Sequence, residues 1–315
     1  MGTSRLWGGL LGMNLRSAYV SRENPARAIR LVNSKHATKL VLQEAEVPTV
    51  PTIVVVRNSR ELLSLDWDKL PGAWALKPDR GCQGAGILLA HGHDGEGWRT
   101  GSGRHLSRFA IADHVRHVLE GESSMADVDH DMAIFESLVV PHELLAELAP
   151  WGLPDLRVIC YRSVPVLAMM RLPTLVSEGR ANLHQGAVGA GIDLESGTIT
   201  SAMLSRKQIT QHPDTGRPLL GVKVPHWEQI LSAASISSRA TGLGYSGVDV
   251  VIDRERGPLV IEVNARPGLE IQNVNGDGLL RRLQVAGTRP TAWAGTVLET
   301  RHELGAGVGV TALEG

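Results

Sequence analysis

The stretch from Ser246 to Glu270, SGVDVVIDRERGPLVIEVNARPGLE, reads as two β-strands joined by a tight turn. Both halves are rich in valine and isoleucine, which favour strands, and the charged run between them supplies the turn. We expect Asp253 to face Pro258 across this turn. Counting back along both strands then places Asp249 directly opposite Glu262. The stretch therefore predicts a β-hairpin with two facing carboxylates.

This acidic pair predicts a divalent cation. Asp249 and Glu262 would repel each other across the ladder and weaken the hairpin unless a cation lay between them. Asn264 adds a third oxygen on the face of Glu262, because side chains alternate along a strand. A few hard oxygen ligands suit Mg²⁺, with Mn²⁺ as the substitute metal, because water and substrate phosphates complete the coordination. The alternative is a solvated hairpin with scattered acidic residues.

A glycine-rich loop lies upstream, within residues 74–91, WALKPDRGCQGAGILLAH. A short strand ending at a lysine leads into the loop, and a second strand follows it. Glycines let the backbone pass close over phosphates, and the lysine adds a positive charge. No Gly-Lys-Ser/Thr opens a helix here, and the loop runs into a strand, so it is neither a Walker A loop nor a dinucleotide fingerprint. A flexible turn is the alternative. The expected phosphate-facing residues are Lys77, Gly81, Gln83, Gly84 and Gly86.

Composition and charge agree with a soluble enzyme. The 315 residues include 32 basic and 33 acidic side chains, and the formal net charge of −1 gives no broad attraction to nucleic acid. Two cysteines are too few for a disulfide framework. No stretch approaches the roughly 20 apolar residues of a membrane span. We therefore expect a cytoplasmic protein without a nucleic-acid partner, and a homo-oligomer is compatible with the sequence.

Hydrophobic patterning predicts an alternation of helices and strands. The segment 91–103 holds five glycines and is expected to be a mobile hairpin. The arginine-rich first 34 residues are expected to present a solvated basic helix face, with an anionic partner as the alternative. The predicted helices cover 33–47, 59–65, 107–120 and 224–243. The predicted strands cover 52–56, 132–140 and 156–173, the last as two strands around Ser163.

Together the motifs resemble those of the ATP-grasp ligases, in the family order from about Asn33 to Leu280. Within that superfamily they are most similar to the bacterial α-L-glutamate ligases. The segments 12–35 and 169–193 point to the glutamate-ligase-related branch. The motifs that carry the resemblance are Lys77 with GCQGAG, the run 155–157 (DLR), the run 181–186 (ANLHQG), and GVDVV followed by GPLVIEVNARPGLE.

The resemblance implies an α+β fold, the ATP-grasp fold, with the nucleotide between two α+β lobes. Similar enzymes carry a larger N-terminal domain, which is much reduced here. The implied divisions are a reduced N-terminal segment (1–32), a small lobe with the glycine loop (33–135), a large lobe with the metal site (136–285) and a C-terminal tail (286–315).

The resemblance also implies where ATP is held. Lys35 corresponds to a second ATP-binding lysine, with a solvated helix lysine as the alternative, and Lys39 one turn later is a weaker candidate. The strand residues Glu136, Ser137 and Leu138 match the segment whose backbone reads adenine. Glu143 is the chosen ribose contact, with Glu147 and Asp155 as the other candidates.

Four further residues are implied to act on the substrates. Arg157 and Arg171 are expected on adjacent strands among apolar neighbours, where each is costly unless it meets an anion. Asn182 matches a position near the triphosphate and metal, and the adjacent His184 is expected to be structural and not a general base. Arg266 stands where the α-L-glutamate ligases that modify a ribosomal protein have serine. It could grip a substrate carboxylate or pair with Glu270 at the surface.

The implied reaction is ATP-dependent amide formation. A carboxylate attacks the γ-phosphate, and an amine then displaces phosphate from the acyl phosphate. The expected partners are glutamate or a similar amino acid and a peptide or small-molecule carboxylate acceptor. A kinase that phosphorylates a hydroxyl is one alternative. A nucleotide-binding module without catalysis is another, although retention of the metal ligands and Lys77 argues against it.

Overall fold

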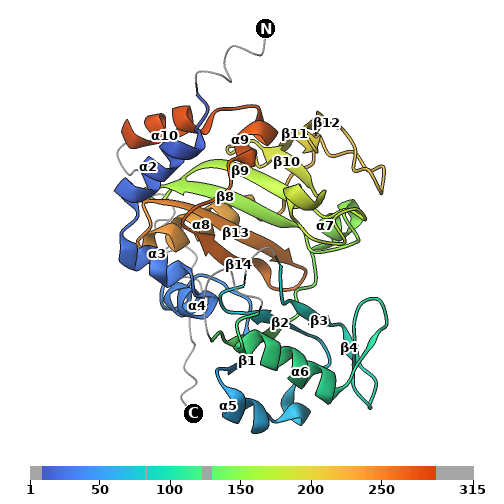
Figure 1. Cartoon of the computed structure of the whole chain (residues 1–315). Helices are drawn as coiled ribbons and strands as arrows, with labels where there is room; N and C mark the ends of the chain where they lie inside the picture. The colour runs from blue at the N-terminus through green and yellow to red at the C-terminus, as the bar shows by residue number, and fades with distance from the viewer. Residues whose placement is uncertain (1–8, 82–83, 123–129, 289–315) are drawn as a thin grey trace, which may run out of the picture.

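The computed structural model describes residues 9–81, 84–122 and 130–288, which form two lobes of helices packed on β-sheets (Figure 1). The large lobe contains a seven-stranded antiparallel sheet in the order β12-β11-β10-β9-β8-β13-β14. Its strands are β8 (Asp155–Tyr161), β9 (Val164–Leu172), β10 (Val188–Ile192), β11 (Ile199–Leu204), β12 (Lys207–Gln208), β13 (Tyr245–Asp253) and β14 (Gly257–Asn264).

The small lobe contains a four-stranded sheet in the order β1-β7-β2-β3, and a three-stranded sheet, β4-β5-β6, extends it. The α+β, two-lobed prediction is confirmed. The strands of the first sheet are β1 (Thr52–Val56), β7 (Ala133–Ser137), β2 (Trp74–Pro78) and β3 (Leu88–Ala90), and those of the second are β4 (Gly92–His93), β5 (Trp98–Arg99) and β6 (His105–Leu106).

Helices cover both sheets. In the small lobe, α5 and α6 bury leucine, isoleucine and valine against the sheet and against Trp74 and Phe135. No helix of the described residues is both long and apolar enough to cross a membrane. The helices are α2 (Met13–Glu23), α3 (Ala26–Val32), α4 (Lys35–Glu44), α5 (Ser59–Leu63), α6 (Arg108–Leu119), α7 (Glu143–Leu148), α8 (Trp227–Ala240), α9 (Glu270–Asn275) and α10 (Leu279–Thr288), with 3-10 turns η1 (Trp67–Lys69) and η2 (Leu183–Gln185).

The two faces of the large sheet have different roles. One face carries valine, leucine and alanine side chains and packs on α8. The other, which we call the charged face, presents Asp249 and the facing Arg157 and Glu262. Toward one end, α2, α9 and α10 cover the charged face with leucine, isoleucine and valine. The opposite end is left facing the small lobe (Figure 1).

The register of the β13–β14 hairpin differs in part from the prediction. Asp253 pairs with Gly257 and not with Pro258, so the predicted count was wrong by one residue at the turn. An irregularity at Ile261, a residue without a partner on β13, then shifts the register. Asp249 therefore does lie opposite Glu262, as predicted. The correct pairing results from two offsets that cancel.

Most predicted elements are present within a few residues. The segment 156–173 forms the two predicted strands, β8 and β9. The turn between them consists of Arg162 and Ser163, which both have positive φ. The segment 91–103 contains the hairpin β4–β5. The helix expected at 33–47 is represented by α4, and it packs in the large-lobe core, where Leu42 and Val47 share a cluster with Val248. The C-terminal tail from residue 289 lies outside the described residues.

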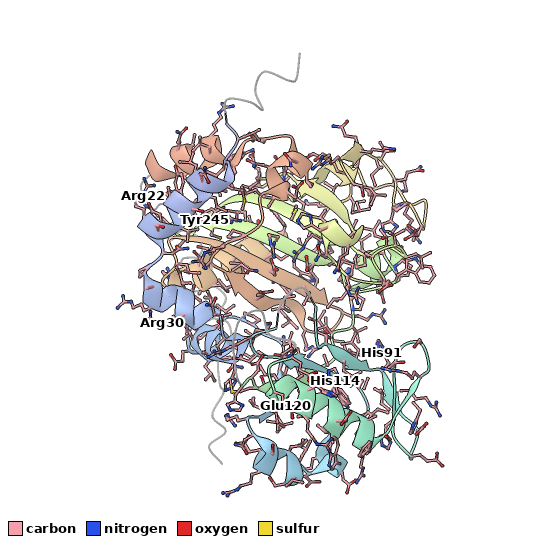
Figure 2. All side chains as sticks on the ribbon, viewed as in Figure 1. Arg22, Arg30, His91, His114, Glu120 and Tyr245 are labelled. Atoms are coloured by element: carbon pink, nitrogen blue, oxygen red, sulfur yellow. The ribbon has the colours of Figure 1, made fainter. Side chains whose placement is uncertain are left out.

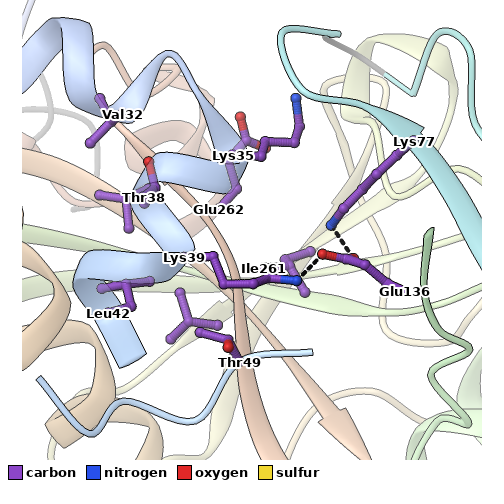
Figure 3. Close-up of a pocket in the computed structure, with 12 residues that line it drawn as sticks. Val32, Lys35, Thr38, Lys39, Leu42, Thr49, Lys77, Glu136, Ile261 and Glu262 are labelled. Atoms are coloured by element: carbon purple, nitrogen blue, oxygen red, sulfur yellow. Dashed lines mark hydrogen bonds and ion pairs between the residues drawn. The ribbon is translucent and has the colours of Figure 1, made fainter. Parts of the chain in front are cut away.

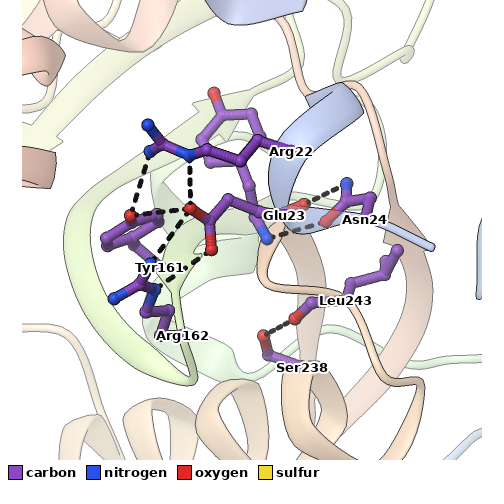
Figure 4. Close-up of polar contacts among 8 residues, drawn as sticks. Arg22, Glu23, Asn24, Tyr161, Arg162, Ser238 and Leu243 are labelled. Carbon is purple, nitrogen blue, oxygen red and sulfur yellow. Dashed lines mark hydrogen bonds and ion pairs between the residues drawn. The ribbon is translucent and has the colours of Figure 1, made fainter. Parts of the chain in front are cut away.

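The N-terminal helices are docked on the large lobe and are not simply a solvated basic face. Val20, Ala28 and Val32 are buried. Glu23 accepts hydrogen bonds from Arg22, Tyr161 and Arg162, which join α2 to the β8–β9 turn (Figure 4). The N-terminal segment therefore forms an integral part of the large lobe.

Asn24 extends the ladder of the large sheet where β14 diverges from β13. Its side-chain amide donates to the carbonyls of Tyr245 (2.8 Å) and Ala265 (3.2 Å), and its side-chain oxygen accepts from the backbone N–H of Tyr245 (2.9 Å). Asn24 is buried, so these groups have no access to water as a substitute. One side chain thus fixes both the start of β13 and the segment that follows Asn264.

Replacing Asn24 is expected to destabilise the protein. Asn24→Ala leaves buried backbone groups of Tyr245 unpaired and should lower the free energy of unfolding by at least about 2 kcal/mol. The measurement is urea unfolding of the variant and of the control Asn33→Ala, at an exposed asparagine that ends α3. Equal stability of the two variants would contradict this role for Asn24.

Candidate functional site

A small pocket lies at the junction of the two lobes. The large lobe contributes α4 and β14, and the small lobe contributes β2 and β7 (Figure 3). Because both lobes supply the lining, the pocket depends on how they pack together. The charged side chains that line it are Lys35, Lys39, Lys77, Glu136 and Glu262.

Glu136 lies between two lysines in this pocket. Its carboxylate pairs with Lys77 at 2.5 Å and also with Lys39 (Figure 3). Lys39 additionally donates to the carbonyl of Val50 (2.7 Å) and to the hydroxyl of Thr52 (3.0 Å). Burial lowers the pKa of Lys39, and the charge of Lys77 acts in the same direction. The positive charge of this site is therefore held at an energetic cost that an anionic ligand would relieve.

Lys35 reaches the start of the glycine loop. Its ammonium group donates to the carbonyl of Asp79 (3.1 Å) and to that of Gly81. The Asp79 carboxylate in turn accepts from the backbone N–H of His36 (2.7 Å) and from the hydroxyl of Ser34 (3.1 Å). Asp79 thus satisfies free N–H groups at the first turn of α4, where a negative charge is favourable. These bonds tie the glycine loop to the helix that carries both lysines.

The described glycines of the loop have backbone requirements of their own. Gly84 and Gly86 have φ values of 81° and 72°, which favour glycine. At Gly81 an added Cβ would lie 2.5 Å from Cγ of Pro78. A merely flexible turn would not need the close packing of Gly81 on Pro78. Gln83, the remaining predicted residue of the loop, lies outside the described residues.

Two buried carboxylates and two partly buried arginines form a cluster on the charged face. Arg157 binds Asp249 with two hydrogen bonds, Nε to Oδ1 (2.8 Å) and Nη2 to Oδ2 (2.6 Å). Arg171 binds Asp155 in the same two-point manner, at 2.5 and 2.6 Å, and also donates to Asp249 (2.8 Å). The prediction that the arginines lie on adjacent strands is confirmed. The anions they meet here are carboxylates of the protein itself.

The two carboxyl groups of the cluster differ in pKa. Burial raises the pKa of Asp155 to about 6, because the loss of solvation outweighs its attraction to Arg171, and Asp249 repels it. Burial opposes ionisation of Asp249 as well, but Arg157 and Arg171 together hold its pKa below the usual value. Asp249 therefore stays charged while Asp155 can take up a proton in mildly acidic solution.

The predicted metal donors lie at the edge of this cluster. Glu262 and Asn264 are half-buried on β14, and neither side chain has a hydrogen-bond or ion-pair partner among the described residues. The charge of Glu262 acts on the pKa of Lys35, so it faces the pocket. Asp249 already accepts three hydrogen bonds from arginines. The free oxygen donors are thus Glu262 and Asn264, with Asp249 adjacent as a fixed negative charge.

The predicted adenine and ribose residues lie on and after β7. The Ser137 N–H donates to the carbonyl of Pro51 (2.9 Å), and the carbonyl of Leu138 accepts from Arg256 (2.8 Å). Glu143 is exposed at the start of α7, 4.0 Å from Arg254. Asp155, an alternative ribose contact, is enclosed in the arginine cluster. The structure does not bring Glu143 into the pocket lining.

Asn182 and Arg266 lie outside the buried cluster. Asn182 caps η2 by accepting from the backbone N–H of His184 (3.0 Å), and His184 itself is exposed. Arg266 is exposed just beyond β14 and has no ion-pair partner among the described residues, so its alternative pairing with Glu270 is not formed. Both residues remain sequence-based candidates.

Two residues of the site are less evident from the sequence than from the structure. Lys39, the weaker candidate on sequence grounds, is buried in the pocket and paired with Glu136. The spacing of four residues on one helix was the available signal, since it places both lysines on one face. The signal for Asp79 is its position directly after the Lys77-Pro78 pair, at the start of the loop.

The raised pKa of Asp155 predicts an unusual pH dependence of stability. The folded state binds this proton up to about pH 6, whereas the unfolded state loses it near the usual value of 3.8. Its contribution to stability therefore falls as the pH rises between about 4 and 6. Asp155→Asn removes this titration, so the variant should gain stability relative to the wild type over that interval.

Urea unfolding at pH 4 and pH 6.5 tests this expectation. Asp193→Asn is the control, because hydrogen bonds from Ser196 lower the pKa of Asp193 and reverse the sign of its contribution. A difference between wild type and Asp155→Asn that does not change with pH would contradict the assignment.

Comparisons with known proteins bear on the fold. A family model described as "Sugar-transfer associated ATP-grasp" matches residues 14–287. No curated protein matches the chain. Biotin carboxylase from Campylobacter jejuni is similar in structure, with a TM-score of 0.54 at 15% identity, over 88% of this chain and 52% of that one. This likeness supports the ATP-grasp fold.

Two other solved structures have lower scores. D-alanine–D-alanine ligase from Bacillus anthracis has a TM-score of 0.47 at 14% identity, covering 88% of this chain and 68% of its own. The ATP-grasp ligase PsnB, with a minimal precursor, has a TM-score of 0.45 at 14% identity over 84% of this chain. The chain spans 63% of the length of PsnB. Membership of the glutamate-ligase-related branch stays a prediction. The family model covers most of the chain. The chain therefore belongs to the sugar-transfer associated ATP-grasp family.

Proposed function

We propose that the protein is an ATP- and Mg²⁺-dependent ligase that joins a carboxylate to an amine through an acyl phosphate. The observation that carries this proposal is the convergence of Lys35, Lys39 and Lys77 on one pocket between the lobes, next to the carboxylates of β14. Three ammonium groups face two carboxylates there, Glu136 and Glu262. A triphosphate bound with its metal supplies the missing negative charge.

The glycine loop and its neighbours are suited to the phosphates. Lys77 lies on β2 immediately before the loop, and Lys35 holds the carbonyl of Gly81 on the loop itself. A bound phosphate could take these ammonium donors in place of the carbonyl oxygen and the Glu136 carboxylate. The backbone of Ser137 and Leu138, on the inner strand β7, is the proposed adenine contact, and Glu143 is the proposed ribose contact after closure of the lobes.

The donor set fits Mg²⁺. Glu262 and Asn264 provide two unshared, half-buried oxygen donors, and Asp249 lies opposite Glu262 on the paired strand. Such a small protein contribution leaves positions for water and for phosphate oxygens. When bound, the metal would neutralise the charge that develops during phosphoryl transfer. Asp249 would add negative charge while the arginines keep it fixed in place.

The arginine cluster is suited to stabilise the reacting centre. Arg157 and Arg171 are held by two-point bonds to carboxylates, so their guanidinium planes cannot swing freely. Fixed positive charges of this kind stabilise a developing oxyanion without reorganising during the reaction. Asn182 on η2 and Arg266 after β14 are the proposed contacts nearer to the substrates. Glutamate or a similar amino acid is the proposed amine or carboxylate, with a peptide or small molecule as the acceptor.

The test is a screen for products. Amino acids and short acidic peptides are incubated with ATP and Mg²⁺, and mass spectrometry detects the added residues. An amide product with release of ADP and phosphate supports the ligase. A phosphate ester would favour the kinase alternative. Failure to bind ATP would contradict both the ligase and the kinase.

A variant of Glu262 tests the metal donors. Glu262→Gln is nearly isosteric and should keep the fold, yet it removes one charge from the metal site and should lower turnover by orders of magnitude. ADP release is measured as a function of Mg²⁺ concentration. Glu255→Gln, at an exposed glutamate of the same hairpin, is the control. Near-normal ADP release by Glu262→Gln would refute the assignment of this donor.

A further inference from the structure

The chain crosses twice between the lobes, at residues 45–51 and at residues 138–142. In Figure 2 the small lobe carries the label of His114 and the large lobe that of Tyr245. Both crossings are bonded to the β13–β14 hairpin. The hairpin that carries the proposed metal donors is therefore also the part of the large lobe to which both crossings are attached.

The second crossing lies along the turn of this hairpin. The backbone N–H of His142 donates to the carbonyl of Ile252 (2.9 Å), and the N–H of Arg254 donates to the carbonyl of Val140 (2.8 Å). These two bonds fix the half of the crossing that enters α7. Side chains of the turn fix the half that leaves β7.

A buried carboxylate in the turn is the first of these side chains. Asp253 is 3% exposed, and its Oδ1 accepts from the backbone N–H groups of Glu255 (3.1 Å) and Arg256 (3.0 Å). Its Oδ2 accepts from the N–H of Val140 (3.0 Å) and from Nη2 of Arg256 (2.6 Å). Burial opposes ionisation of Asp253, but these bonds hold its pKa below the usual value. Asp253 is thus a fixed negative charge that joins the turn to the crossing.

Arg256 is the second side chain. The nitrogen that binds Asp253, Nη2, also donates to the carbonyl of Leu138 at 2.8 Å. Because one nitrogen makes both bonds, the position of Asp253 determines where the Leu138 carbonyl is held. Leu138 follows Glu136, a residue of the pocket lining, by two positions.

The Leu138 carbonyl determines the direction of the next N–H group. A peptide group is planar and trans, so its N–H points opposite to its C=O. The bond to Arg256 therefore turns the N–H of Val139 away from Arg256. This N–H has no hydrogen-bond partner among the described residues, and the Val139 side chain packs against a cluster that contains Val251 and Leu259. The unpaired N–H is thus held in one direction and is available to a ligand.

We infer that Arg256 and Asp253 are positioning residues for recognition of the nucleotide base, an inference that rests on the proposed ATP site. They are absent from the pocket lining and act by aiming the peptide group between Leu138 and Val139. An N–H donor matches N1 of adenine, which is an acceptor. It opposes N1 of guanine, which carries a hydrogen atom. Selectivity for adenine over guanine is therefore expected to depend on the hairpin turn.

Nucleotide titrations test this role. ATP, GTP and tripolyphosphate are titrated by calorimetry in the presence of Mg²⁺ and without an acceptor substrate. The wild type should bind ATP more tightly than GTP. Arg256→Met removes both bonds of Nη2 and should weaken ATP binding roughly three- to tenfold, the value of one hydrogen bond. The affinity for tripolyphosphate, which has no base, should stay unchanged.

Two further variants separate positioning from stability. Arg256→Lys should restore the preference for ATP, because a lysine ammonium group can make both bonds of the single nitrogen. Asp253→Asn keeps the side-chain volume but loses an acceptor oxygen, so it should lower the preference in the same direction as Arg256→Met. Arg239→Met is the control, at an exposed arginine of α8, and should match the wild type.

The outcomes that overturn the inference are distinct from those that overturn the proposed function. A lowered melting temperature of Arg256→Met with an unchanged ratio of ATP to GTP affinity would mean that the turn is only structural. Equal loss of ATP and tripolyphosphate binding, or a wild type without preference for ATP, would also overturn the inference, and each leaves the ligase function standing. A wild type that binds no nucleotide removes the proposed function itself.

Discussion

The bidentate pairing of Asp249 with Arg157 is the interaction on which the charged face depends. Burying an isolated charge at either position would cost too much desolvation free energy. Arg171 and Asp155 offset this cost, because with Arg157 and Asp249 they complete a neutral group of four. The four residues come from β8, β9 and β13, so the cluster requires that these strands be adjacent. The order of the large sheet and the polarity of its charged face are thereby linked.

The pocket between the lobes extends this electrostatic arrangement. The guanidinium groups lie on the sheet of the large lobe, whereas Lys77 and Glu136 come from the small lobe. The helix α4 connects the two, because its first turn binds Asp79 beside the glycine loop and its apolar side packs in the large-lobe core. A phosphate-bearing ligand between the lobes would meet positive charge from both sides. Lobe closure and charge neutralisation are thus expected to be coupled.

The N-terminal helices support the segment that follows β14. Asn24 completes the hydrogen bonding at the point where β13 and β14 part, and Arg16 binds the carbonyl of Pro267 three residues after Asn264. The strand β14, which carries Glu262 and Asn264, therefore leads directly into a segment that the N-terminal helices hold. Two polar side chains are enough for this support, because Arg16 and Asn24 each donate to a backbone carbonyl of the large lobe.

The sequence by itself determined the local features of this protein. Alternation and turn residues are short-range properties, so the hairpin with Asp249 opposite Glu262 and the glycine loop after Lys77 could be predicted. The predicted turn was one residue off, and the irregularity at Ile261 compensated for that error. The tertiary structure decided which charges meet. The partners Lys39 and Glu136 are 97 residues apart, and Arg157 and Asp249 are 92 apart. No local pattern encodes such pairs, because strand order and lobe packing alone bring them within hydrogen-bonding distance.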